Sequence, residues 1–368
     1  MRVGILKEPP FDNRVAMLPE HIALYKKLNV QILVETLAGE KAFATDDAYR
    51  TSGAEVVSRQ EILSCDVVVG IHLPEENEFP QLKGKVIVGA YQPLYHKELF
   101  QKIASSGIQA FSLDMLPRTT RAQSMDVLSS QANIAGYKAV LVAANLYPRY
   151  FPMFMTAAGS IAPAKFLILG AGVAGLQAIA TARRLGGIVE VFDTRPAVKE
   201  EVQSLGGKFV EVEGAADASQ AGGYAVEQTE DFLLRQKEKI ASSVKKADVI
   251  ITTAQIFGKK APILVTEEMI ATMKHGSVII DIASSTGGNT ELTKDNEMII
   301  SHGVTIVGNS NLPSTMPSDA SKLYGKNVYN FLELIIDKEK GLNMNFDDEL
   351  VKGACMTSEG EIKNDLLK

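Results

Sequence analysis

The chain has 368 residues, more than a single hydrophobic core normally accommodates and enough for two domains. Its 46% hydrophobic and 22% charged residues are typical of a globular α/β protein and exclude a disordered or fibrous one. A net charge of −6 provides no broad basic surface, which argues against nucleic acid as the main partner.

The N-terminus and the cysteines favour an intracellular protein. Residues 1–10 contain no apolar stretch long enough for a secretory signal. Cys65 and Cys355 lie far apart, and so few cysteines in so long a chain indicate buried thiols in a reducing compartment. The most apolar stretch, Leu167–Ala182, contains three glycines and is shorter than the roughly 20 residues that a membrane helix needs. We therefore expect no membrane span, and expect any membrane association to come through a partner.

Short apolar runs rich in β-branched residues alternate with helical patterns along most of the chain, as in parallel βαβ units. In the first half the candidate strands are Val3–Leu6, Gln31–Glu35, Asp66–Ile71, Val86–Tyr91 and Gln109–Leu113. In the second half they are Phe166–Leu169, Ile188–Phe192, Lys208–Val212, Asp248–Thr252, Ser277–Ile282 and Thr305–Val307. The pattern predicts an α/β fold with two Rossmann-like, doubly wound parallel-sheet domains and a cleft between them.

Two helical patterns indicate where the chain passes between the domains. The alanine-rich segment Asp126–Tyr147 lies between the two sets of strands, and Ser318–Ile336 follows the last strand. We therefore predict a discontinuous first domain, with Gly341–Glu361 as a strand-rich tail packed on it. The alternative is that this tail caps the second domain. The predicted boundaries are residues 1–128 with 320–368 for the first domain and residues 129–319 for the second.

Polar side chains crowd into Pro117–Tyr137, at the predicted crossing between the domains. They are Arg118, Arg121, Gln123, Ser124, Asp126, Ser129, Ser130, Gln131 and Asn133. Because ligands often bind at domain clefts, we expect this cluster to face a bound ligand. The alternative is a helix N-terminus that is capped by Ser124 or Asp126, with the other groups in water. That alternative accounts for a cap but not for so many uncharged hydrogen-bonding groups.

A glycine-rich turn between a strand and a helix is the most informative motif. The apolar strand that begins near residue 164 runs into GAGVAG at residues 170–175 and then into a helical pattern. Gly170 permits the tight turn, Gly172 allows a pyrophosphate to approach the helix N-terminus, and Gly175 lets the helix pack closely on the strand. A turn of this kind that binds nothing is the weaker alternative, because the strand, the helix and an acidic partner are all present.

The acidic partner of the glycine turn is Asp193, which ends the next candidate strand, 23 residues after Gly170. Its carboxylate is expected to accept hydrogen bonds from the hydroxyls of an adenosine ribose. A carboxylate repels a 2′-phosphate, so the sequence favours NAD(H) over NADP(H). Arg195 lies close by and weakens this preference, because a guanidinium can hold a phosphate.

Glu213–Tyr224 is rich in glycine, alanine, serine and aspartate and shows little apolar periodicity, which predicts a long loop. Long loops inside compact domains are often functional, so we interpret it as a mobile lid, with a passive surface loop as the alternative. The histidines are scattered without metal-ligand spacing and no Cys/His cluster accompanies them, so we predict no metal site.

The chain resembles the NAD(H)-binding component, domain I, of proton-translocating transhydrogenase over nearly its whole length. The resemblance is carried by Gln123–Tyr137, Gly170–Gln177, Thr252–Ala254 and the Gly287–Asn289 turn. It implies direct, reversible hydride transfer between NAD(H) bound here and NADP(H) bound on a partner beta subunit, coupled to proton translocation by a membrane domain. It also implies a homodimer. Because this chain ends before any membrane helices, it resembles the split-gene form, whose alpha subunit is cytoplasmic and peripheral on the inner membrane.

The resemblance also assigns roles to individual residues. Arg118, Gln123, Asp126 and Ser129 are implied to be the catalytic, nicotinamide-side residues, with Arg118 and Asp126 able to form an ion pair. Tyr224 is implied to belong to a mobile loop that closes over the nucleotide. The candidate cofactor-binding residues are Gly170, Gly172, Val173, Ala174, Gly175, Asp193, Thr194, Arg195, Tyr224, Thr253, Ala254, Gln131 and Asn133.

The related alanine dehydrogenase family provides an alternative function, amino-acid oxidation. That family shares an arginine that matches Arg14. Where it has a lysine, a histidine and an aspartate, however, this chain has His72, Gln92 and Ser285. Amino-acid oxidation needs a proton acceptor, whereas direct hydride transfer between two nicotinamides needs only orientation of the rings. The residues therefore favour transhydrogenation, with an alanine dehydrogenase-like oxidoreductase and a non-catalytic NAD(H)-sensing module as the alternatives.

Overall fold

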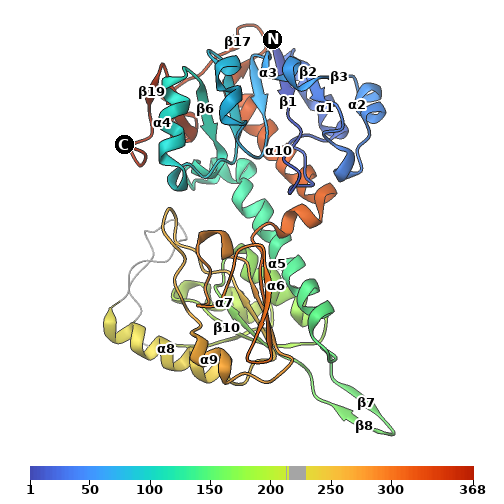
Figure 1. Ribbon diagram of the computed structural model, residues 1–368, viewed down its shortest axis with the longest axis vertical. Coiled ribbons are helices and arrows are strands. Elements are labelled where there is room, and N and C mark those ends of the chain that lie inside the picture. The colour runs from blue at the N-terminus through green and yellow to red at the C-terminus, as the bar shows by residue number, and fades with distance from the viewer. Residues whose placement is uncertain (213, 215–228) are drawn as a thin grey trace. The chain divides into compact units, whose positions relative to one another are not determined.

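The computed structural model describes residues 1–212, 214 and 229–368. These residues form two compact α/β units (Figure 1). Unit 1 contains Met1–Gln131 and Pro313–Lys368, and unit 2 contains Ala132–Leu312. The helix α5 (Val127–Leu146) begins in unit 1 and continues into unit 2.

The sheet of unit 1 has the strand order β19-β18-β6-β5-β4-β1-β2-β3. Its strands are β1 (Arg2–Ile5), β2 (Gln31–Glu35), β3 (Glu55–Val57), β4 (Val67–Val69), β5 (Val86–Gly89), β6 (Gln109–Ser112), β18 (Cys355–Ser358) and β19 (Glu361–Ile362). The strands β1 to β6 run parallel in the order 3-2-1-4-5-6, which is that of a Rossmann fold. The strand β18 pairs antiparallel with β6, so the C-terminal tail extends this sheet.

Helices cover the sheet of unit 1. They are α1 (Ile22–Tyr25), α2 (Asp46–Ser52), α3 (Arg59–Leu63), α4 (Lys97–Ser105), α10 (Pro317–Ile335) and α11 (Glu349–Ala354). The long helix α10 buries Tyr324, Val328 and Leu332 in the same core as Val3 and Val34 of the sheet. Its apolar residues recur every three or four positions, which places them on one face. The C-terminal part of the chain is therefore integral to the core of unit 1.

The sheet of unit 2 has the order β11-β10-β9-β12-β13-β15-β14. Its strands are β9 (Lys165–Leu169), β10 (Ile188–Phe192), β11 (Lys208–Phe209), β12 (Val249–Thr252), β13 (Val278–Asp281), β14 (Met298–Ser301) and β15 (Val304–Gly308). All except β14 run parallel, again in the Rossmann order. The order reverses between β9 and β12, which is where ligands bind in open sheets of this kind.

Both faces of the second sheet are buried, as a doubly wound fold requires. Phe166 and Ile168 of β9 join a core with α5 and α6 (Val173–Arg184), whereas Leu167 and Leu169 join a second core with α8 (Glu230–Val244) and α9 (Glu267–Ala271). This alternation follows from the two-residue period of a strand. The short helix α7 (Lys199–Ser204) follows β10. The continuous apolar runs of the sequence are thus explained by burial on two sides.

Three structural features were missed by the strand predictions. The strands β3 and β14 lie at sheet edges, where half-exposed residues weaken the apolar signal. The third is a hairpin of β7 (Phe154–Thr156) and β8 (Gly159–Ile161), which protrudes from unit 2 in Figure 1. The predicted loop Glu213–Tyr224 lies, except for Gly214, outside the described residues.

None of the helices in the described part of the chain is long and apolar enough to cross a membrane. The two longest, α5 and α10, carry polar side chains along their length.

Candidate functional site

The glycine turn after β9 has a separate steric reason for each glycine. Gly170 has φ +105°, a left-handed conformation that disfavours any side chain, and its N–H donates to the Phe192 carbonyl at 2.8 Å. A Cβ on Gly175 would lie 1.9 Å from the Gly170 carbonyl oxygen, so only glycine lets α6 pack this closely on the turn. A Cβ on Gly172 would meet no atom within 4 Å. Gly172 thus leaves open space above the turn.

The open space at Gly172 lies at the N-terminus of α6. Gly172 is the N-cap residue, and its carbonyl accepts the first helical hydrogen bond from Leu176 at 2.9 Å. Val173 is exposed and Ala174 is buried in this first turn. The first N–H groups of a helix lack partners within the helix and carry the positive end of its dipole, so this turn suits an anionic group such as a pyrophosphate.

Asp193 lies beside the glycine turn, at the end of β10, and its carboxylate is nearly enclosed. Its Oδ2 accepts a hydrogen bond from the Ala171 N–H at 2.7 Å. Arg195 donates three more hydrogen bonds: its backbone N–H and Nε to Oδ1 at 2.8 Å each, and Nη2 to Oδ2 at 2.7 Å. The predicted acidic partner therefore touches the turn, as expected. The neighbouring Thr194 is half-buried.

The turn after β12 faces the glycine turn from the other side of the switch point. Thr253 donates its N–H to the Leu169 carbonyl at 2.8 Å and its hydroxyl to the Gly170 carbonyl at 3.2 Å. The backbone of Ala254 is held by the fully buried Asn289, whose Oδ1 accepts its N–H at 3.0 Å and whose Nδ2 donates to its carbonyl at 2.8 Å. The side chain of Asn289 thus fixes the shape of this turn.

A buried acid orients Asn289. Asp281 ends β13 with no exposed surface, and its Oδ2 accepts the Asn289 N–H and the Thr293 hydroxyl at 2.7 Å each. In the sequence, Asn289 was notable only as part of the turn that carries the family resemblance, and no motif singled out Asp281. Asp281 could have been identified from the sequence in the same way as Asp193, because it is an acidic residue at the end of an apolar strand.

The polar segment of unit 1 includes a helix cap. Asp126 precedes α5, and its carboxylate accepts the backbone N–H of Ser129 at 2.8 Å and its hydroxyl at 2.6 Å. This is the capping role that was the structural alternative for Asp126. The remaining segment is anchored through its backbone, because the Ser124 carbonyl accepts hydrogen bonds from Asn327 and Asn330 of α10 at 2.8 Å each.

The other predicted residues of this region lie in differing surroundings. Arg118 and Gln123 are exposed. Gln131 is engaged, since its Oε1 accepts from Arg14 Nη1 at 2.9 Å and its Nε2 donates to the Ala320 carbonyl at 3.1 Å. Asn133, in unit 2, donates to Gln177 at 3.3 Å. Tyr224 lies outside the described residues. The Gln123 amide and the Arg118 guanidinium thus both lie on the surface of unit 1.

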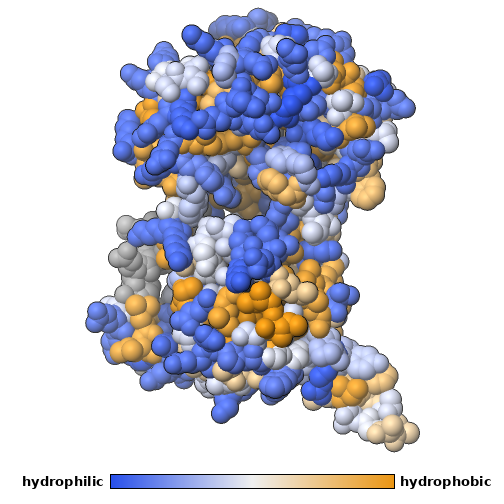
Figure 2. Space-filling view, viewed as in Figure 1, coloured by the Kyte–Doolittle hydropathy of each residue, from blue (hydrophilic) through white to orange (hydrophobic). Residues whose placement is uncertain are grey.

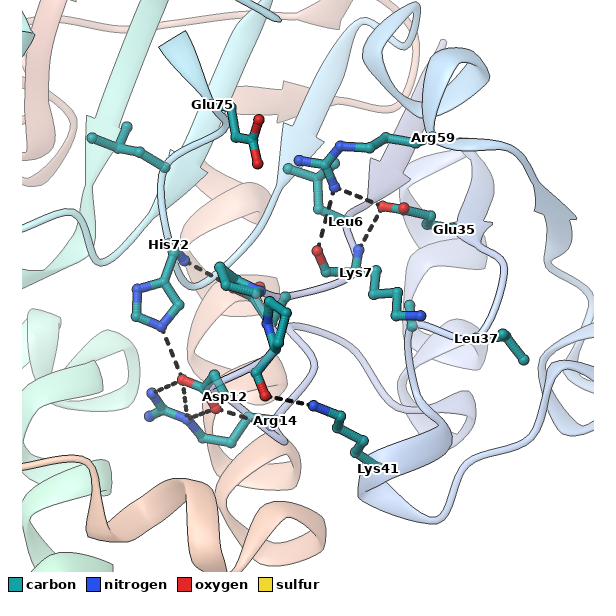
Figure 3. A pocket seen from close by; sticks show the side chains of 15 residues that line it. Leu6, Lys7, Asp12, Arg14, Glu35, Leu37, Lys41, Arg59, His72 and Glu75 are labelled. Atoms are coloured by element: carbon teal, nitrogen blue, oxygen red, sulfur yellow. Dashed lines mark hydrogen bonds and ion pairs between the residues drawn. The ribbon is translucent and has the colours of Figure 1, made fainter. Parts of the chain in front are cut away.

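Unit 1 contains a cavity of about 500 Å³ beyond the ends of the neighbouring strands β4, β1 and β2, next to its own switch point (Figure 3). Asp12 lies at one edge, where Figure 3 shows Arg14 and His72 pointing at the same carboxylate. Arg14 Nη2 donates to its Oδ2 at 2.5 Å and His72 Nε2 lies 2.9 Å from that oxygen. Burial opposes ionisation of Asp12, but the hydrogen bonds from His72 and Arg14 hold its pKa well below its usual range. Arg14 is thus already paired with a buried carboxylate.

Glu8, which also lines the cavity, is a buried carboxyl that sequence reasoning did not identify. It accepts the backbone N–H groups of Ile71 at 2.6 Å and His72 at 3.1 Å. Burial raises its pKa to about 7, although His72 and these hydrogen bonds act in the opposite direction. No local pattern marks this residue, because its partners come from the segment after β4, which is more than 60 residues away.

The raised pKa of Glu8 makes stability depend on pH. A carboxyl whose pKa rises from 4.5 to about 7 on folding contributes stability that is complete below pH 4.5 and is lost as pH rises through 7. Relative to Glu8→Gln, the wild-type free energy of unfolding should therefore fall by about 2 kcal/mol between pH 5 and pH 8. Urea unfolding of both proteins across this range measures the difference. If the free energy of unfolding changed with pH by the same amount in both proteins, the raised pKa of Glu8 would be contradicted.

Comparisons with known proteins identify the family of the chain. The family "Alanine dehydrogenase/PNT, N-terminal domain" matches residues 4–135, and its "C-terminal domain" matches residues 139–365. The chain is 45% identical to the first portion of the NAD(P) transhydrogenase alpha subunit of Rhodospirillum rubrum, over 98% of this chain and 97% of that protein. It is 29% identical to "Alanine dehydrogenase 2" of Staphylococcus aureus (strain USA300), over 86% of this chain and 82% of that protein. A crystal structure of transhydrogenase from Sinorhizobium meliloti superposes with a TM-score of 0.87, at 39% identity and 99% coverage of both chains.

Proposed function

Because the chain belongs to the alanine dehydrogenase/PNT family, and within it to the NAD(P) transhydrogenase alpha subunits, we propose that it binds NAD(H) and exchanges hydride with NADP(H) on a partner subunit. The observation that carries this proposal is the contact between Asp193 and the glycine turn, with open space at Gly172. A carboxylate and a helix N-terminus this close together match the ribose and pyrophosphate of a dinucleotide.

The described residues would hold the adenosine half of NAD(H) in unit 2. The first turn of α6 would receive the pyrophosphate, and Asp193 would accept the ribose hydroxyls. Thr253 and Ala254, fixed by Asn289, form the opposite wall of the switch point. The residues present therefore suit NAD(H), and the carboxylate disfavours a 2′-phosphate at this position.

The reaction requires orientation and not proton transfer. Bound NADH supplies a hydride from its C4 atom to C4 of NADP⁺, which yields NAD⁺ and NADPH without the transfer of a separate proton. As part of the proposal, Arg118, Gln123, Asp126 and Ser129 act on the nicotinamide side by hydrogen bonding and orienting the ring. Holding two rings in register lowers the barrier because translational and rotational freedom is already lost.

Partners and assembly complete the proposal. The NADP(H)-binding beta subunit and a membrane domain would supply the second nucleotide and the coupling to protons, and would place this chain at the inner membrane. A homodimer is part of the same proposal. The protruding hairpin supports it, because Phe154 and Met155 of β7 are 46–72% exposed, as are Tyr150 and Met153 just before it, and Figure 2 shows hydrophobic colouring on parts of the hairpin. A two-stranded hairpin is marginally stable alone, so burial against a second copy would stabilise it.

The decisive test mixes the purified chain with the NADP(H)-binding subunit and follows single-turnover reduction of an NAD⁺ analogue by NADPH. We expect rapid transfer with the wild type. Gln123→Asn, which shortens an exposed amide by one methylene, should bind NADH normally and transfer hydride roughly tenfold more slowly, because the rings lose alignment. Ser124→Ala is the matched control, since the Ser124 backbone and not its hydroxyl anchors the segment.

Each other outcome has a defined meaning. An unchanged rate in Gln123→Asn would remove Gln123 from the site. NADH binding without transfer, even with a loaded partner, would favour an NAD(H)-sensing module. Alanine-dependent NADH formation by the chain alone would favour an amino-acid dehydrogenase, which the neutralised Arg14 argues against.

A further inference from the structure

Asp193 is already saturated with donors in the described structure. A carboxylate offers about four lone-pair positions on its two oxygens. Oδ1 accepts the backbone N–H and Nε of Arg195, and Oδ2 accepts Arg195 Nη2 and the Ala171 N–H. Two donors on each oxygen leave no position for the two hydroxyls of a ribose. A dinucleotide therefore has to displace donors before it can use Asp193.

The donors differ in how easily they leave. The Ala171 N–H belongs to the glycine turn, whose shape is fixed by the left-handed Gly170. The Arg195 N–H is fixed by its place two residues after Asp193, at the start of a short 3-10 helix, Pro196–Val198. The guanidinium, by contrast, sits on a flexible stem and its side chain keeps 17% of its surface exposed. It holds one position on each oxygen, which matches the pair of hydroxyls.

We propose that the Arg195 guanidinium is a latch that competes with the adenosine ribose for Asp193 and, once displaced, lies beside the ribose 2′ position. This inference rests on the proposed binding of NAD(H) by unit 2. Arg195 is accordingly a specificity-determining residue. Arg195 weakens NAD(H) binding because it occupies the Asp193 carboxylate. It strengthens NADP(H) binding because the released guanidinium attracts the 2′-phosphate.

The charges around the latch permit this exchange. The hydrogen bonds that the Arg195 guanidinium donates to Asp193 raise the pKa of Arg195, and the negative charge of Glu201 on α7 acts in the same direction. Glu201 thus offers the displaced guanidinium a second favourable environment on the neighbouring helix. The Arg195 side chain keeps 17% of its surface exposed, so the displaced guanidinium can turn toward solvent and Glu201, while the ribose hydroxyls keep the enclosed Asp193 carboxylate hydrogen-bonded.

The test compares NADH and NADPH titrations, by fluorescence or calorimetry, for the full-length wild type and Arg195→Ala. We expect Arg195→Ala to bind NADH roughly three- to tenfold more tightly, because Asp193 starts without its competitor. NADPH should bind more weakly by a similar factor, since the bare carboxylate repels the 2′-phosphate. Arg195→Lys should fall between the two, because an ammonium lacks the paired donors. Lys199→Ala removes a nearby cation that pairs with Glu211 and is the matched control.

A double-mutant cycle separates the latch from a structural role. In an Asp193→Asn background the substitution Arg195→Ala should leave NADH affinity unchanged, because the competition no longer exists. Weaker or unchanged NADH binding by Arg195→Ala, or NADPH binding that does not weaken, would overturn the proposal. Failure of the proposed function has a different signature, in which the wild type does not bind NADH or Asp193→Asn binds it as well as the wild type.

Discussion

Gly175→Ala is expected to lower the free energy of unfolding by about 3 kcal/mol or more. The added methyl would lie 1.9 Å from the Gly170 carbonyl oxygen and 2.9 Å from its carbonyl carbon. That backbone cannot yield, because Gly170 is held in a left-handed turn by its hydrogen bond to Phe192. The helix α6 therefore has to move away from β9, which disrupts packing of unit 2 on both sides of the helix.

The helix α5 limits how far α6 can move. A Cβ on Gly136 of α5 would lie 2.0 Å from the Ala174 carbonyl oxygen, which shows that the two helices are in backbone contact. Thermal unfolding measures the effect, and a fall in Tm of roughly 6–12 °C corresponds to this loss in a domain of this size. A melting curve that coincides with the wild type would show that the turn is more pliable than its geometry indicates.

Gly172→Ala is expected to weaken NADH binding about 100-fold, or roughly 2.7 kcal/mol, while stability is unchanged. The new methyl meets no protein atom within 4 Å, and the φ of −76° suits alanine. The methyl would instead occupy the space through which a pyrophosphate approaches the first turn of α6. The cost therefore falls on the ligand and not on the fold.

The two alanine variants are controls for one another, because they make the same chemical change three residues apart in one turn. NADH titration combined with thermal unfolding should show loss of affinity with normal stability for Gly172→Ala, and loss of stability for Gly175→Ala. If Gly172→Ala bound NADH with wild-type affinity, the pyrophosphate could not lie at this helix N-terminus. That result would remove the main support for the proposed dinucleotide site.

Sequence periodicity was sufficient to predict the central strands of each sheet but not the strands at the sheet edges. The apolar runs predicted the central parallel strands because these are buried on both faces and every residue contributes to the signal. The edge strands β3 and β14 and the β7–β8 hairpin were missed, since exposed residues carry little apolar periodicity. The predicted strand Lys208–Val212 is only two residues long as β11.

The sequence by itself determined the turn that suits a dinucleotide, because Gly170, Gly172, Gly175 and Asp193 belong to one βαβ unit whose local geometry follows from residue spacing. Only the tertiary structure decided that the Ala171 N–H donates to Asp193 and that Asn289 shapes the Ala254 turn. It also decided that Glu8 is buried against the segment that follows β4. These contacts join segments that are brought together by strand order, and neither spacing nor periodicity encodes which loop ends meet at a switch point.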